Sequence, residues 1–151
     1  MVIESFLDDL YREVIMDHYR FPRHRHPVEA PDITAEGYNP LCGDEISLQL
    51  KLKGGRIEKV GVQIRGCSIS QASGSMMAEQ LVGKTPAEAE ALISAFQRMM
   101  RGEGIEGGGE ELGEDIEALE GVKKFPVRIK CALLPWTTLG EGMKRGLKVK
   151  G

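Results

Sequence analysis

The chain has 151 residues, of which 41% are hydrophobic, 28% charged and 5% aromatic, and its net charge is −3. This length suits one domain with a real hydrophobic core, and the lack of 18 consecutive apolar residues argues against a membrane span. The first residues are acidic where a secretory signal is basic, and the Lys and Arg residues are scattered, so we expect a cytoplasmic protein that binds neither membrane nor nucleic acid.

An amphipathic helix is predicted over residues 3–20, because apolar residues recur there at spacings of three and four. Pro22 ends this helix, and a loop follows. The three histidines of the chain, His18, His24 and His26, lie in this helix and loop, remote in sequence from the cysteines. We therefore expect the histidines on the surface and not in a metal site.

Two runs of alternating apolar and polar residues, 46–53 and 60–65, flank Gly54 and Gly55. Period-two runs around a Gly-Gly pair predict a β-hairpin. Residues 34–40 are expected to add a third strand.

The pattern then becomes helical, with one helix predicted over residues 68–81. Residues 85–88, Thr-Pro-Ala-Glu, predict the start of another, with Thr as N-cap, Pro at the first position and Glu at the third, and this helix should run to about Met100. A final helix is predicted from about Cys131 to residue 146, with Pro135 in its first turn.

Residues 102–121 contain eight acidic residues, seven glycines and no basic residue, and we expect an acidic, Gly-rich insertion that is loosely held and mobile. A short helix over residues 114–119 is the exception. Residues 102–107 match G-x-G-x-x-G, but the dinucleotide fingerprint follows a strand and here a helix precedes it. Residues 1–151 are expected to form a single α+β domain, with a small three-stranded antiparallel sheet packed with the N-terminal helix and the later helices.

Three cysteines, Cys42, Cys67 and Cys131, each lie at a junction between predicted elements, and Asp44 closely follows the first. An odd number of cysteines in a cytoplasmic chain argues against a disulfide framework. Helix N-termini and nearby basic residues lower thiol pKa values and favour thiolates. Thiolates and a carboxylate that converge in four-coordinate geometry suit Zn²⁺ or an iron–sulfur cluster. Ordinary burial in the core is the alternative role for these thiols.

The motifs around these residues resemble those of the U-type iron–sulfur cluster scaffold family, which comprises IscU, SufU and the N-terminal part of NifU. They are Tyr-x-x-x-Ile-x-x-His-Tyr-x-x-Pro at 11–22, Asn-Pro-x-Cys-Gly-Asp at 39–44, Gly-Cys-Ser-Ile-Ser-x-Ala-Ser at 66–73 and Lys-Cys-Ala at 130–132. The resemblance implies the SufE/NifU-like fold, a three-stranded antiparallel sheet packed with helices. It also implies cysteines that receive sulfur from a cysteine desulfurase and hold a nascent cluster or a zinc ion.

Two departures from the IscU pattern indicate the SufU branch. Lys130 stands where IscU-type members have a histidine, and the connection between the second and third cysteines is longer. The resemblance to SufU then implies four metal ligands: Cys42, Asp44, Cys67 and Cys131. It also makes Cys42 the sulfur acceptor, with Cys131 as the runner-up. Arg128 and Lys130 are expected to compensate the negative charge of the site.

We therefore expect an iron–sulfur cluster assembly protein that accepts sulfur from a cysteine desulfurase and serves as the scaffold for a nascent [2Fe–2S] cluster. Recipient apo-proteins or carrier proteins would take the cluster, and the chain is expected to be a non-catalytic scaffold or, at most, a sulfurtransferase that accepts sulfur. One alternative is a zinc-dependent sulfurtransferase that never carries a cluster, which Lys130 favours because only four convincing ligands remain. The other alternative is a module whose zinc is purely structural. Asp44, as the weakest ligand, is expected to leave the metal first.

Overall fold

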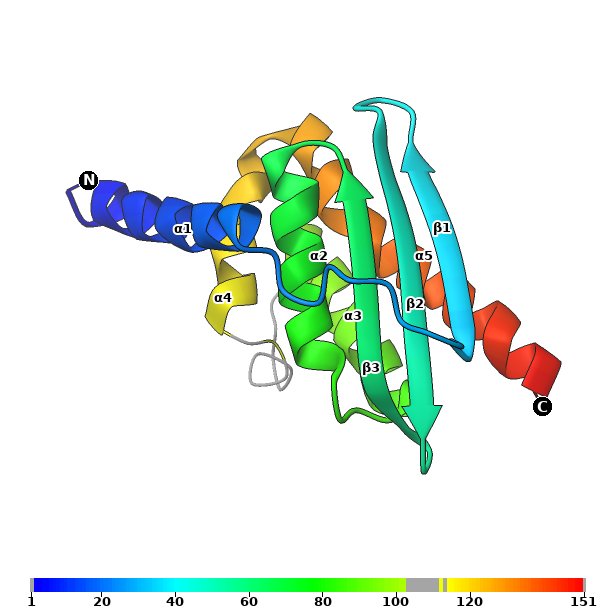
Figure 1. Cartoon of the computed structure of the whole chain (residues 1–151). Coiled ribbons are helices and arrows are strands. Elements are labelled where there is room, and N and C mark those ends of the chain that lie inside the picture. Colours follow the sequence, from blue (N-terminus) through cyan, green and yellow to red (C-terminus); the bar gives the residue numbers. More distant parts are fainter. Residues whose placement is uncertain (1, 103–111, 113, 151) are drawn as a thin grey trace.

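One antiparallel sheet and the helices packed on one of its faces make up the fold (Figure 1). The computed structural model describes residues 2–102, 112 and 114–150, with side chains over 11–102, 112 and 115–146. The elements in chain order are α1 (Val2–Arg20), β1 (Ile33–Asn39), β2 (Asp44–Lys53), β3 (Arg56–Arg65), α2 (Ser68–Leu81), α3 (Pro86–Met100), α4 (Glu114–Glu117), the 3-10 helix η1 (Ala118–Lys124) and α5 (Pro126–Lys150). The predicted fold class is confirmed. Among the described residues, no helix has the length and apolar character that a bilayer span requires.

The sheet has the order β1-β2-β3, and both neighbouring pairs are antiparallel. Gly54 and Gly55 form the turn between β2 and β3 with φ angles of +61° and +77°, which glycine adopts without strain and which two-residue hairpins require. The predicted hairpin and third strand are therefore confirmed. The segment after α1 runs across the outer face of the sheet, where the Val62 N–H donates to the His24 carbonyl at 2.8 Å.

The core lies between the inner face of the sheet and helices α2, α3 and α5. Its largest fully buried side chains include Leu48, Leu50, Met76, Met77, Phe96 and Trp136. The rings of Phe96 and Trp136 stack with their centroids 4.5 Å apart, which joins α3 to α5. The predicted start of α3 is confirmed, because Thr85 and Glu88 form a capping box around Pro86.

Helix α5 starts earlier than predicted, at Pro126 and not near Cys131. A proline is tolerated throughout the first turn of a helix, so Pro126 at the first position of α5 and Pro135 in the first turn of a helix from about Cys131 fit the sequence equally well. The consequence is that Pro135 lies inside the helix, and Cys131 lies within the helix and not at its N-terminus.

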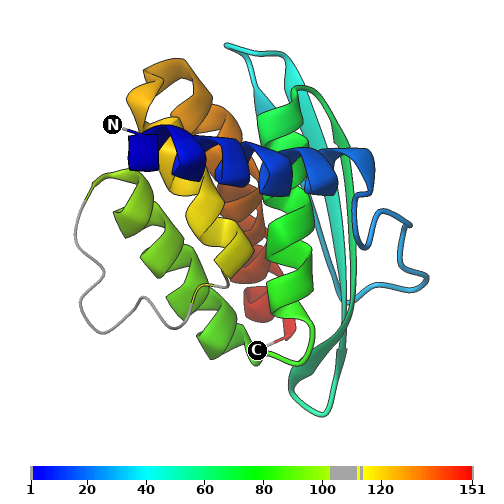
Figure 2. The same cartoon turned by 90° about the vertical axis from the view of Figure 1, so that its left-hand side faces the viewer.

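The prediction for the histidines is correct for two of them and wrong for the third. His24 and His26 are exposed, but His18 has no exposed surface. Helix α1 lies across α2 and beside α4 (Figure 2), and His18 is on the face of α1 that these helices cover. Amphipathic spacing alone does not reveal a buried polar residue whose partners lie on later helices.

The acidic stretch 102–121 is only partly described, because residues 103–111 and 113, on which most of the predicted mobility falls, lie outside the described residues. The described C-terminal part of this stretch is packed against the rest of the domain. Leu112, Ile116 and Leu119 are 3%, 0% and 0% exposed and belong to the hydrophobic core. The predicted short helix is present, as α4 continued by η1.

We predict that Leu119→Ala lowers the free energy of unfolding by about 2–5 kcal/mol, because it leaves a cavity in the core. Glu120→Ala is the neighbouring control at an exposed position and should change this value by no more than about 0.5 kcal/mol. Urea unfolding followed by circular dichroism measures both. Equal stability of the two variants would show that η1 does not contribute to the core.

Candidate metal centre

The turn between β1 and β2 places Cys42 at one end of the sheet. Asn39 and Asp44 are paired in the register of these strands, and the Asn39 carbonyl accepts the N–H groups of Cys42 at 3.3 Å and Gly43 at 2.7 Å. Gly43 has a φ of +75°, a conformation that favours glycine. This tight turn fixes the thiol of Cys42 close to the start of β2.

Asp44 lies beside the junction between β3 and α2, because Glu45 pairs with Arg65 in the register of β2 and β3. Its Oδ1 accepts the backbone N–H of Cys67 at 2.9 Å, and its Oδ2 is 3.7 Å from the Cys67 thiol. A Cβ atom on Gly66 would overlap the Asp44 carboxylate. A glycine at 66 is therefore what allows this carboxylate to pack against the chain before α2.

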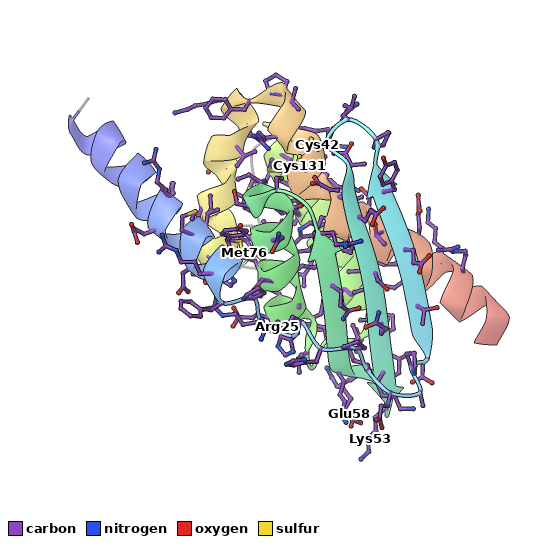
Figure 3. The ribbon with its side chains drawn as sticks, turned by 45° about the horizontal axis from the view of Figure 1, so that its top comes forward. Arg25, Cys42, Lys53, Glu58, Met76 and Cys131 are labelled. Atoms are coloured by element: carbon purple, nitrogen blue, oxygen red, sulfur yellow. The ribbon has the colours of Figure 1, made fainter. Side chains whose placement is uncertain are left out.

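Cys131, on α5, completes the cluster from the other side. Its Sγ is 3.0 Å from the Sγ of Cys42 and 3.8 Å from Nδ2 of Asn39. Figure 3 shows Cys42 and Cys131 next to each other where the β1–β2 turn meets α5. Three distant parts of the sequence thus meet at one end of the molecule.

Donor atoms of Cys42, Asp44 and Cys131 all lie within 4.8 Å of one another. Cys67 is not within that limit of all three, but its thiol contacts Asp44. Three sulfurs and one carboxylate are a donor set that suits Zn²⁺ or an iron–sulfur cluster. Two thiolates on one tetrahedral zinc ion, each with a Zn–S bond of about 2.3 Å, lie roughly 3.8 Å apart. The Cys42 and Cys131 sulfurs are 3.0 Å apart, so a small side-chain movement of about 1 Å would allow both to bind the ion.

Burial divides the four candidate ligands into two pairs. Asp44 and Cys131 have no exposed surface, whereas Cys42 and Cys67 are half-buried. A carboxylate without solvent contact is costly unless hydrogen bonds and a cation compensate it. The structure gives Asp44 the Cys67 N–H and thiol, and a bound cation would supply the rest.

The pKa of the Cys131 thiol is raised, in contrast to the lowered value expected of a thiol at a helix N-terminus. Burial is the main cause, and the neighbouring groups of Cys42, Asp44 and Cys67 raise this pKa further. The sequence-based expectation is wrong at Cys131 because α5 begins at Pro126, which leaves the thiol inside the helix.

Of the two cationic residues predicted near the site, Arg128 interacts electrostatically with the thiols. The negative charge of the Cys67 thiolate, followed by that of Cys131, raises the pKa of the Arg128 guanidinium. Lys130 is exposed, and in the part of the chain that the structure describes no contact joins it to the cysteines. Of the two residues, Arg128 is therefore the one whose interaction with the thiols the described part of the chain shows.

A groove of about 1200 Å³ opens beside the cysteines, between α1, η1 and the start of α5. Cys42, Cys67 and Arg128 are part of its lining, and apolar side chains, including those of Ile15 and Val122, make up most of the rest. Phe125 and Val127, also in the lining, are 60% and 58% exposed. Exposed apolar side chains of this size next to reactive thiols are typical of a surface that another protein covers.

Two residues that support the site, Asn39 and Gly66, are not among those that the sequence predicts to act there. Asn39 is almost fully buried, holds the Cys42 turn and points its amide at the Cys131 sulfur. Both residues lie inside the cysteine motifs, and this position is the feature of the sequence that could have indicated their roles. Their roles depend on the strand register, which a motif does not reveal.

Comparison with known proteins agrees with this geometry. Residues 10–132 match the model of the NifU-like N-terminal domain family. The chain is 44% identical to the zinc-dependent sulfurtransferase SufU of Bacillus subtilis, covering 96% of this chain and 97% of that protein. It is 42% identical to the iron–sulfur cluster assembly scaffold protein IscU of Streptococcus pyogenes, covering 93% and 87%.

Solved structures show the same fold. A candidate scaffold protein for the SUF system from Fervidobacterium islandicum superposes with a TM-score of 0.80 at 37% identity, over 87% of this chain and 94% of that one. The N-terminal part of a NifU-like protein from Brucella abortus also gives 0.80, at 26% identity, over 95% and 98%.

We predict that Gly66→Ala weakens zinc binding modestly, by up to about tenfold as for loss of one ligand of four, because its Cβ displaces the Asp44 carboxylate. Gly121→Ala is a matched control, since a Cβ there meets nothing within 4 Å. Competition with a colorimetric chelator measures the affinity, and circular dichroism checks the fold. Unchanged affinity in a folded Gly66→Ala variant would contradict the role given to Gly66.

Proposed function

Because the chain belongs to the family of NifU-like N-terminal domains, we propose that it is an iron–sulfur cluster assembly protein. It accepts sulfur from a cysteine desulfurase and holds a nascent cluster on Cys42, Cys67 and Cys131. The observation that carries this proposal is the convergence of three thiols and one buried carboxylate at one end of the sheet. The Bacillus subtilis relative is named as a zinc-dependent sulfurtransferase, and the Streptococcus pyogenes relative is named as an iron–sulfur cluster assembly scaffold protein.

In the absence of a cluster, we propose that the same three thiols and Asp44 hold one zinc ion. A bound zinc ion keeps thiols deprotonated, which offsets the raised pKa of Cys131. Arg128 compensates part of the negative charge. Asp44 is the weakest of the four ligands, since carboxylate is harder than thiolate, and its release frees a position.

Sulfur acceptance is proposed at Cys42, with Cys131 as the runner-up. The acceptor thiolate attacks the terminal sulfur of the desulfurase persulfide, a new S–S bond forms and the old one breaks. The desulfurase cysteine leaves as a thiolate with the electron pair of the broken bond, and the transferred sulfur keeps its proton as the outer sulfur of the new persulfide, so no oxidant is needed. Cys42 is half-buried and lines the groove, whereas Cys131 has no exposed surface, which supports Cys42 as the acceptor.

The groove beside Cys42 is the proposed docking place of the desulfurase. It is largely apolar, and the exposed Phe125 and Val127 stand at its edge. We also propose that the chain forms one domain, in which residues 102–121 are an acidic insertion, and that it acts in the cytoplasm. Recipient apo-proteins or carrier proteins then take the cluster from it.

A second candidate function is zinc-dependent sulfur transfer without any bound cluster. Two observations favour it: the fourth donor is a carboxylate, and the residue before Cys131 is an exposed lysine that cannot ligate. A purely structural zinc has less support, because the hydrophobic core of the sheet and helices is built without the cysteine sulfurs.

Anaerobic incubation with a cysteine desulfurase, cysteine and iron tests the proposal. We expect persulfide on the chain, visible by mass spectrometry, and loss of this signal in Cys42→Ser. Charge-transfer absorption in the visible range indicates a cluster and favours the scaffold, whereas persulfide without colour favours sulfur transfer. If neither persulfide nor colour forms, the proposed function is wrong.

Asp44→Ala is the companion variant in this experiment. It keeps the three thiols, so zinc affinity should fall only modestly, because water can take the vacant position. Sulfur acceptance and onward transfer should slow, and any bound cluster should live longer. Unchanged persulfide uptake in Asp44→Ala would exclude Asp44 as the ligand whose release opens the site.

A further inference from the structure

A second group of potential metal ligands lies where α1, α2 and α4 meet. The Nε2 atom of His18 is 2.7 Å from Oδ2 of Asp115 and 3.6 Å from Oε1 of Glu79, and the three donor atoms all lie within 4.8 Å of one another. Glu79 is twelve residues beyond Cys67 on the same helical stretch, which corresponds to about 18 Å of helix. This group is therefore separate from the thiol site.

The imidazole of His18 is held in one orientation. Its ring has no exposed surface, and Nδ1 is 2.8 Å from the Ser75 hydroxyl, which also accepts the Arg23 backbone N–H at 2.9 Å. The hydroxyl oxygen has two lone pairs, so it can accept from both Nδ1–H and Arg23. In the tautomer with its proton on Nδ1, the Nε2 lone pair faces the two carboxylates, and a bound cation would take the place of the proton that otherwise joins Nε2 to Asp115. A histidine that binds metal through one nitrogen usually donates its other N–H in this manner.

Negative charge exceeds positive charge around Nε2. Glu79 and Asp115 face one imidazole nitrogen, which has at most one proton for two carboxylates. The nearest guanidinium, that of Arg23, is 3.7 Å from Glu79 and is shared with Asp17 at 2.7 Å. The Glu79 and Asp115 side chains are 42% and 51% exposed, so water can reach the open side of the group.

From these contacts we propose that His18, Glu79 and Asp115 bind a divalent first-row transition-metal ion, with water in the remaining positions. One imidazole nitrogen and two carboxylate oxygens form a harder donor set than three thiolates, so this site and the thiol site select different metals. Because the ligands come from three helices, the ion fixes α1 and α4 to α2. The proposal does not depend on the function assigned to the cysteines.

Titration of the full-length, zinc-loaded chain with Mn²⁺ tests the proposal. Mn²⁺ has the lowest affinity in the divalent series and prefers oxygen ligands, so it does not displace zinc from thiolates. Electron paramagnetic resonance of free Mn²⁺ should show one bound ion per chain. Paramagnetic broadening of amide signals should centre on residues 18, 75, 79 and 115, and not on the cysteines.

Asp115→Asn and Glu79→Gln should each weaken Mn²⁺ binding at least about tenfold. Both positions are about half-exposed, and each substituted amide keeps an oxygen that can accept a hydrogen bond from His18, so the fold should persist. Glu120→Gln, equally exposed and paired with Lys123, is the matched control and should bind as the unmodified chain does.

Three results would overturn the proposal: no bound Mn²⁺ at millimolar concentration, binding by both variants as tight as by the unmodified chain, or broadening around Cys42 and Cys67. The group is then only a hydrogen-bonded junction between helices. Zinc content and persulfide uptake report on the thiol site alone, so failure of this proposal and failure of the proposed function are distinguishable.

Discussion

Asp44 has no exposed surface, and a carboxylate in that environment costs several kcal/mol of desolvation unless hydrogen bonds and a cation compensate it. Several features of the surrounding structure accommodate this buried carboxylate. The strand register carries Asp44 to the β3–α2 junction, Gly66 leaves room for it, and the Cys67 N–H donates to it. The tight turn and α5 then bring two further sulfurs to the same place. A metal ion on the proposed four ligands would add positive charge to that of Arg128, which interacts with the thiols.

Much of the fold could be predicted from local signals. The alternation around Gly54 and Gly55 predicted the hairpin, and the Thr85 capping pattern predicted the start of α3, because both depend on residues adjacent in sequence. The cysteine motifs correctly identified the residues that meet at one end of the sheet. They could do so because Cys42 and Cys67 lie next to a turn or a helix start that their own neighbours specify, whereas Cys131 lies inside α5.

Other features depend on contacts between distant segments and could not be predicted. His18 is buried because Ser75 and Asp115, on later helices, supply its partners. Leu119 follows a run of acidic and glycine residues, yet its side chain is part of the core where η1 packs on α1 and α5. The pKa of Cys131 is raised mainly by its burial and further by Cys42, Asp44 and Cys67, which come from distant parts of the sequence. In each case the deciding interaction is tertiary.

X-ray absorption at the zinc edge of the anaerobically purified, zinc-loaded chain tests the central claim most directly. One buried carboxylate and three thiolates on one ion predict three sulfurs at about 2.3 Å and one oxygen at about 2.0 Å. The oxygen shell should persist when the sample is prepared at different buffer compositions, since Asp44 is part of the protein. Four sulfurs per zinc, or a first shell dominated by nitrogen and oxygen, would contradict the account.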